Sequence, residues 1–237
     1  MTEQEKLRLE FDGYLDIILT EAKRSFDIRH VGKKIINDLS KFNLYSKQQN
    51  VQFLDSWIIQ KDRTGFTLSC IEIDSVLALP GKFTSLYNIQ AHKFLLGYLR
   101  TRDDFGNSFI RPETIPDKLT EIFQPNEVDF DNHPQFSGKY YCLTNDTYKF
   151  RKAMTLELMN VLAFVSPLEI EFLGNQCLFK QTKSIIDIKG SLKFISTGIE
   201  LAKNLNPGNI NLNCLNIFNL TYIFILACIT PEKQNKQ

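Results

Sequence analysis

Residues 168–180, LEIEFLGNQCLFK, constrain the fold more than any other stretch of the sequence. Alternating apolar and polar side chains flank a Gly-Asn pair at positions 174 and 175, and a glycine in first position suits a two-residue hairpin turn. With this turn, the residues that face each other are Phe172 and Cys177, Ile170 and Phe179, and Glu169 and Lys180. The first two pairs share one face and the charged pair lies on the other, so we predict an antiparallel hairpin in this register.

The rest of the chain predicts an α+β fold. Strand-like runs cover 53–60, 66–74, 92–101 and 137–144, and the apolar phase of the second run shifts at Ile71, which indicates a bulge or a partly covered second face. Helical spacing covers 2–26, 31–42, 117–123, 156–165 and 192–205. We expect Asp146 to cap the turn that contains Phe150, Thr155 to cap the helix 156–165, and this helix, which has two apolar stripes, to be buried. We expect an antiparallel sheet with helices packed on one face. The predicted parts are an N-terminal helical segment (1–50), an α+β domain (51–206) and an apolar C-terminal tail (207–237).

Charge and cysteine content exclude several classes of protein. The net charge is +1, so no overall field steers the chain onto nucleic acid, and we predict no nucleic-acid partner. The five cysteines form no CxxC pair, which favours a reducing compartment with buried thiols. The first ten residues, MTEQEKLRLE, are charged and unlike a secretion signal. We therefore expect a cytoplasmic location.

Asp104, Phe105 and Gly106 form a triplet that holds a magnesium ion in protein kinases. A kinase also needs a glycine-rich loop, a strand lysine paired with a helix glutamate, and an HRD-type catalytic loop, and the sequence supplies none of these. The polar residues 102–107 lie between two strand-like runs, FLLGYLRT and SFIRP. We predict that they form a hairpin connection instead.

Asp129, Asp131 and His133, in VDFDNH, form the candidate metal site. In an extended segment these three side chains project to one side, where two carboxylates and an imidazole can reach one cation. Aspartate and asparagine before Pro134 are also ordinary turn and cap residues, so a structural role explains the same pattern. The sequence identifies no catalytic residue and no cofactor.

The tail is the least polar part of the chain. No charged residue occurs from Asn204 to Pro231, and residues 212–229 are mostly apolar, with asparagines at 213, 216 and 219. The strongest apolar run is shorter than the about 20 residues that a membrane-spanning helix needs. The sequence leaves three interpretations open: a buried element of the fold, a membrane-associated tail, or an altered end of a longer chain.

Residues 93–180 resemble a bacterial family called domain of unknown function 3137. The matching stretches are FLLGYLRTRDDFGNSFIRPETIPDKL, VDFDNHPQFSGKYYCLTNDTYKFRKAMTLELMNVL and LEIEFLGNQCLFK. The resemblance implies a shared order of strand, polar turn, aromatic strand, helices and closing hairpin. It carries no catalytic residues. Many members of the family have hydrophobic segments near the N-terminus, whereas this chain has none before residue 200.

Two functions follow from these patterns. The first is a non-catalytic binding or scaffolding domain with a protein partner and an unknown ligand, acting at the cytoplasmic membrane surface through residues 212–229. The alternative is a metal-dependent enzyme centred on Asp129, Asp131 and His133. Metal content distinguishes the two functions.

Overall fold

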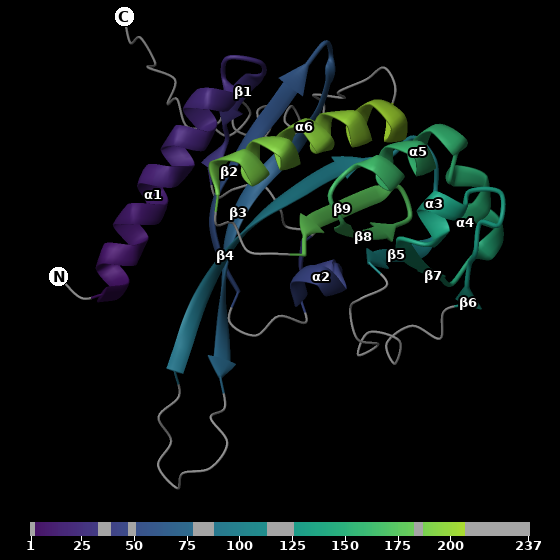
Figure 1. The fold of residues 1–237 in the computed structure, drawn as a ribbon, viewed down its shortest axis with the longest axis horizontal. Helices are drawn as coiled ribbons and strands as arrows, with labels where there is room; N and C mark the ends of the chain where they lie inside the picture. Colours follow the sequence, from purple (N-terminus) through teal and green to yellow (C-terminus); the bar gives the residue numbers. More distant parts are fainter. Residues whose placement is uncertain are drawn as a thin grey trace, which may run out of the picture.

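A computed structural model of the chain describes residues 3–32, 39–46, 51–77, 88–112, 126–182 and 187–206 (Figure 1). Within these ranges, nine strands join in one sheet with the order β1-β2-β3-β4-β9-β8-β5-β7-β6, and all neighbours are antiparallel. The strands are β1 (Asp27–His30), β2 (Val51–Lys61), β3 (Thr64–Leu77), β4 (Asn88–Arg100), β5 (Asn107–Pro112), β6 (Asn126–Glu127), β7 (Tyr140–Thr144), β8 (Leu168–Leu173) and β9 (Gln176–Gln181). The predicted α+β class is confirmed.

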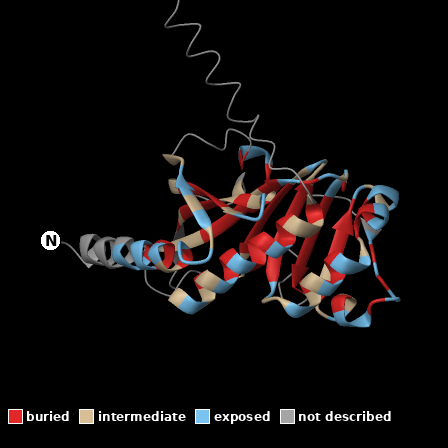
Figure 2. Ribbon diagram, turned by 90° about the horizontal axis from the view of Figure 1, so that it is seen from above, coloured by how far each residue is buried: buried red, intermediate tan, exposed pale blue. Residues whose placement is uncertain are grey.

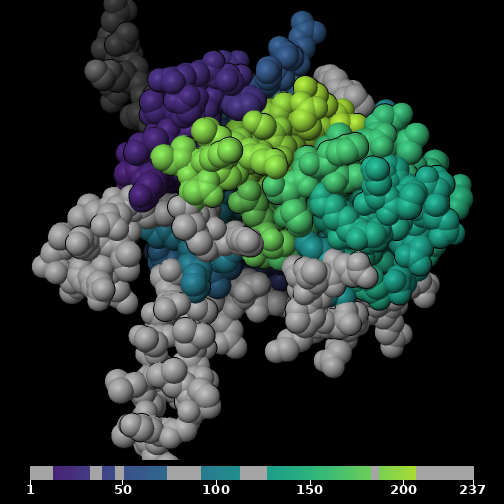
Figure 3. Space-filling model, in the orientation of Figure 1, coloured from purple at the N-terminus to yellow at the C-terminus, as the bar shows by residue number. Residues whose placement is uncertain are grey.

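Helices cover the two faces of the sheet unequally. On one face, which we call the helical face, α6 (Ile188–Leu205) crosses the strands, with α1 (Glu3–Ala22) and α5 (Leu156–Phe164) packed against it (Figures 1 and 3). The short helices α3 (Pro134–Ser137) and α4 (Thr147–Ala153) lie near the β6 end of the sheet (Figure 1). The opposite face holds a short segment, residues 39–46, which contains the 3-10 turn η2 (Leu39–Lys41) and α2 (Asn43–Ser46). In the described ranges no helix has the length and hydrophobicity needed to cross a bilayer.

Each face of the sheet has its own apolar core. On the helical face, the Phe179 ring packs against Phe66, with 5.6 Å between ring centroids, and against Phe194 of α6, at 5.4 Å. On the opposite face, Phe42 of the 39–46 segment belongs to a smaller cluster that includes Leu96 and Leu178. The middle strands are therefore buried on both sides (Figure 2).

Burial on both sides also explains the shifted apolar phase of β3. Leu68 belongs to the helical-face core, whereas Ile71 belongs to the opposite core. An irregularity in the strand pairing does occur, but it lies on β2, where the register shifts between Phe53 and Asp55. The extra residue, Leu54, lies across from the point where β3 changes phase.

The predicted hairpin is confirmed in full. β8 and β9 pair in the expected register, with Phe172 opposite Cys177, Ile170 opposite Phe179, and Glu169 opposite Lys180. Gly174 has a φ of 60°, a left-handed conformation that glycine adopts without a steric cost. A glycine is therefore suited to position 174, because the first residue of this two-residue turn needs a positive φ.

The hairpin connection predicted at residues 102–107 is wrong. β4 and β5 flank these residues in the chain, but the β8–β9 hairpin lies between the two strands in the sheet. The connection therefore passes over the tip of that hairpin and forms two hydrogen bonds with Gly174. The Gly174 N–H donates to the carbonyl of Gly106 (2.9 Å), and the Gly174 carbonyl accepts from the N–H of Phe105 (3.0 Å). The sequence showed a polar turn between two strands but not the pair of strands inserted there.

The helix predicted over 31–42 also differs from the structure. The preceding residues form strand β1, which pairs with β2, and Val31 N–H continues the pairing by donating to the Ser56 carbonyl (3.0 Å). Residues 33–38 lie outside the described part. The first helix ends at Ala22 instead of continuing to residue 26.

The predicted ends of the later helices are confirmed. Asp146 and Thr155 cap α4 and α5, because their side chains accept from the N–H groups of Lys149 (3.0 Å) and Leu158 (3.2 Å). The expectation that α5 is buried on two faces is wrong. Leu158 of one predicted stripe is buried, but Leu156 of the other is 53% exposed, and so is Phe164, at 77%. The predicted helix 117–123 and the tail 207–237 lie outside the described residues.

Candidate functional site

His133, the imidazole of the predicted metal site, is occupied by structural hydrogen bonds. It is buried, and its Nδ1 accepts from the N–H of Phe136 at 3.2 Å, which caps the start of α3. Its Nε2 lies 2.9 Å from Oδ1 of Asn160 on α5. Both ring nitrogens therefore hold α3 and α5 together, and neither points toward the two aspartates as a ligand.

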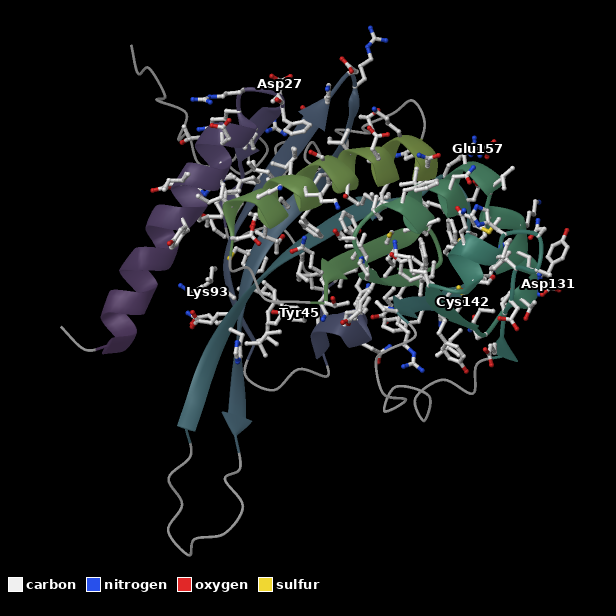
Figure 4. All side chains as sticks on the ribbon, viewed as in Figure 1. Asp27, Tyr45, Lys93, Asp131, Cys142 and Glu157 are labelled. Atoms are coloured by element: carbon white, nitrogen blue, oxygen red, sulfur yellow. The ribbon has the colours of Figure 1, made fainter. Side chains whose placement is uncertain are left out.

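The two aspartates of the predicted site lie at the surface. Asp129 and Asp131 are exposed on the stretch between β6 and α3, and Asp131 is found at the rim of the molecule in Figure 4. Among the residues that the structure describes, no three His, Cys, Asp or Glu side chains come together in a way that could hold a metal ion. The geometry gives no support to metal binding by Asp129, Asp131 and His133, which stays a prediction.

The triplet Asp104-Phe105-Gly106 has a structural role. Asp104 Oδ1 accepts from the N–H of Gly106 (2.8 Å), and Oδ2 pairs with the Lys149 ammonium (2.9 Å). The Gly106 N–H, followed by Lys149, lowers the pKa of the Asp104 carboxyl. Phe105 is 1% exposed and stacks on Phe172, with ring centroids 4.1 Å apart. The loop therefore anchors itself to the β8–β9 hairpin and to α4.

The opposite face carries four buried charged side chains. They are Arg111 on β5, Glu169 and Glu171 on β8, and Lys180 on β9. Lys180 Nζ and Glu169 Oε2 are 2.9 Å apart, and the Arg111 guanidinium lies over the Tyr141 ring, 4.7 Å from its centroid. Buried charges are stable only when they are paired or hydrogen-bonded. The sequence predicted the Glu169–Lys180 pair but not the burial of Arg111 and Glu171.

Glu171 holds the 39–46 segment on the sheet. Its carboxylate, fully buried, accepts from the N–H of Asn43 (2.8 Å), from the Asn43 side-chain amide (2.9 Å) and from the N–H of Leu44 (2.7 Å). These bonds satisfy N–H groups that begin α2 and would otherwise lack partners in a buried place. A sequence signal existed: glutamate recurs at alternate positions of the apolar run LEIEFL.

Large exposed apolar side chains occur on three helices. Tyr14 and Ile17 on α1 are 50% and 51% exposed. Tyr148 on α4 is 76% exposed, and Leu156 and Phe164 on α5 are 53% and 77% exposed. A shallow open pocket on α1 is lined by Asp16, Ile17, Thr20 and Glu21. Exposed apolar groups that gather on neighbouring elements are typical of binding surfaces.

Comparisons with known proteins identify no family. No protein-family model matches the chain, and no curated protein matches it. Among solved structures, the crystal structure of the mycobacterial trehalose monomycolate transport factor A, TtfA, is similar, with 12% sequence identity and a TM-score of 0.48. The match covers 83% of this chain and 98% of that one. A likeness this distant supports no conclusion about function, and the resemblance to domain of unknown function 3137 stays a prediction.

Proposed function

We propose that this chain is a non-catalytic binding or scaffolding domain that holds a protein partner at the cytoplasmic membrane surface. The observation that carries the proposal is the exposure of Tyr148 and Leu156 on two consecutive helices, α4 and α5. Leaving such side chains in water gives up the roughly 1.5 to 3 kcal/mol that burying each of them would contribute. A partner that covers α4 and α5 recovers part of this free energy.

The polar groups of the described residues support a binding role. Asp146, Thr155 and Asp187 cap helices. Glu171 holds the 39–46 segment, and His133 joins α3 to α5. These side chains stabilise the fold, so the binding surface is supplied by the exposed apolar groups.

The membrane part of the proposal rests on the sequence of the tail. Residues 212–229 contain no charged side chain, and residues 207–211 separate them from the described part that ends at Asn206. Apolar segments of this composition partition toward lipid when the fold does not bury them. The tail would keep the domain near the bilayer while the helices α4 and α5 meet the partner.

An affinity pull-down with membranes retained tests both parts of the proposal together. We expect the full chain to sediment with membranes after a high-speed spin of lysed cells and to recover a defined protein partner. Recovery of that partner should fall when Leu156 and Tyr148 are replaced by serine. If the full chain and a shortened chain ending at residue 206 both stay in the supernatant, the membrane part is wrong. If the serine variant recovers the partner unchanged, the helices α4 and α5 are not the binding surface.

A further inference from the structure

The C-terminal end of α5 is held by a lysine ammonium. Lys139 Nζ donates to the carbonyls of Leu162 (2.8 Å), Ala163 (2.9 Å) and Val165. These carbonyls lie at the negative end of the helix dipole, where a cation is favourable. Lys139, from the turn before β7, therefore places a positive charge at the end of the helix that carries Phe164.

Two further lysines lie on the neighbouring helix. Lys189 and Lys193 are exposed and four residues apart on α6, so they share one side of that helix. Leu168, which begins the strand after α5, pairs with Gln181, and the Gln181 side-chain amide donates to the Gly190 carbonyl (3.1 Å), so the start of α6 lies near the strand that follows α5. Burial, and then the charge of Lys193, lowers the pKa of Lys139, in agreement with this arrangement. These three lysines form no ion pair with any acidic side chain in the described part of the chain.

Phe164 adds an apolar group to this gathering of cations. Its side chain is 77% exposed, although the carbonyls of the residues on either side of it in the chain accept hydrogen bonds from Lys139. Pro167, three residues further on, is also exposed. Proteins that bind to membrane surfaces often combine an exposed aromatic ring with several lysines. The ring enters the interface, and the ammonium groups are attracted to anionic lipid headgroups.

We propose that Lys139, Lys189, Lys193 and Phe164, which we call the lysine–phenylalanine patch, bind an anionic phospholipid surface. The inference rests on the proposed function and names the face of the domain that meets the membrane. Like charges gathered without acidic partners repel one another, and an anionic surface offsets that repulsion. Asp187 is the N-cap of α6, and its carboxylate accepts from the N–H of Gly190 (2.6 Å). A lipid surface fits better than a soluble phosphate, because only lipid gives Phe164 an apolar environment.

Vesicle sedimentation with the full chain tests the patch. The probes are vesicles of phosphatidylcholine alone and of phosphatidylcholine mixed with phosphatidylglycerol. We expect tighter binding to the anionic vesicles and a loss of about 25-fold for the double variant Lys189→Gln/Lys193→Gln, since each lysine near an anionic surface is worth about fivefold in affinity. Phe164→Ser should weaken binding about tenfold. Lys203→Gln is the matched control, because Lys203 lies on the same helix but pairs with Glu200 (2.7 Å).

Each of the other results would overturn the patch in a distinguishable way. Equal binding to both kinds of vesicle, unchanged in the double variant, would mean that the tail alone binds lipid, which contradicts the patch but leaves the proposed function standing. Displacement from anionic vesicles by inorganic phosphate, beyond the effect of sodium chloride at the same ionic strength, would identify a site for a soluble anion. No sedimentation with either vesicle would overturn the patch and the membrane part of the proposed function together.

Discussion

The two faces of the sheet are closed by different physical means. The helical face is covered by long helices and an almost wholly apolar core, in which the Phe179 ring contacts β3 and α6. The opposite face carries buried charges, and within the described residues a short segment, 39–46, covers part of it. Apolar contact is not directional, whereas the bonds of Glu171 to Asn43 and Leu44 fix one position of that segment. One face therefore provides stability, and the other specifies where a short segment lies.

The largest expected effect is on the helical face. Phe179→Ala should lower the free energy of unfolding by about 3 to 5 kcal/mol, because Phe179 is fully buried and its loss leaves a cavity between Phe66 and Phe194. Urea denaturation measures the change. Phe164→Ala is the control, since it removes the same ring from an exposed position and should cost less than about 1 kcal/mol. Equal losses at the two positions would contradict the described core.

The Glu169–Lys180 pair on the opposite face should respond differently to single and double changes. Lys180→Met leaves Glu169 buried without its cation and should cost about 3 kcal/mol. The double variant Lys180→Met/Glu169→Leu should recover most of that loss, because apolar side chains of similar volume replace a pair whose desolvation is costly. Denaturant midpoints of the two variants give the comparison. If the double variant is no more stable than the single one, an unpaired buried Glu169 is not the cause of the loss.

Glu171→Gln tests how the 39–46 segment is held. The amide keeps the shape of the carboxylate but has one acceptor oxygen, and its NH2 group would face an N–H of Asn43 or Leu44 without accepting from it, so we expect a loss of about 2 kcal/mol. Amide hydrogen exchange should become faster at Leu44 and stay unchanged in α6. Glu157→Gln, an exposed change on α5, should leave both regions unaffected. Faster exchange throughout the sheet would show that Glu171 supports the whole fold.

Alkaline pH should weaken the helical face through Tyr140. Burial raises the pKa of the Tyr140 hydroxyl from 10.0 to about 12. The unfolded chain ionises first, so stability is fully present below pH 10 and is lost as the pH rises toward 12. Tyr140→Phe removes this dependence, and the difference between the two proteins should change by about 1.4 kcal/mol between pH 9 and 11. Burial raises the pKa of the Cys142 and Cys177 thiols as well, so these groups also make the stability of both proteins depend on alkaline pH. The difference in stability between the wild-type protein and Tyr140→Phe isolates the contribution of Tyr140.

Local features of the fold could be predicted from the sequence. The β8–β9 register depends on a turn and on alternation within residues 168–180, and the caps at Asp146 and Thr155 depend on neighbouring N–H groups. Cys70, Cys142 and Cys177 are buried as their apolar surroundings indicated. In each case the interactions that decide the structure lie close together in the chain, so a short stretch of sequence contains them.

Features that depend on distant contacts could not be predicted. Nothing in residues 102–107 indicates that two strands from 168–181 enter between β4 and β5. His133 appeared available as a ligand because Asn160, which contacts its Nε2, lies 27 residues away. The two apolar stripes of α5 indicated burial on both faces, but Leu156 of one stripe is 53% exposed. The same stripe is a reason to look for a binding partner there.

The place of the β8–β9 hairpin has a consequence for synthesis on the ribosome. β4 and β5 are made early, yet the edges they turn toward each other stay open until residue 181 has emerged. An unpaired strand edge can join other chains, so the nascent chain passes through a stage in which it is prone to aggregation. Slow translation ahead of residue 168 would prolong that stage, and rapid release of the two late strands would shorten it.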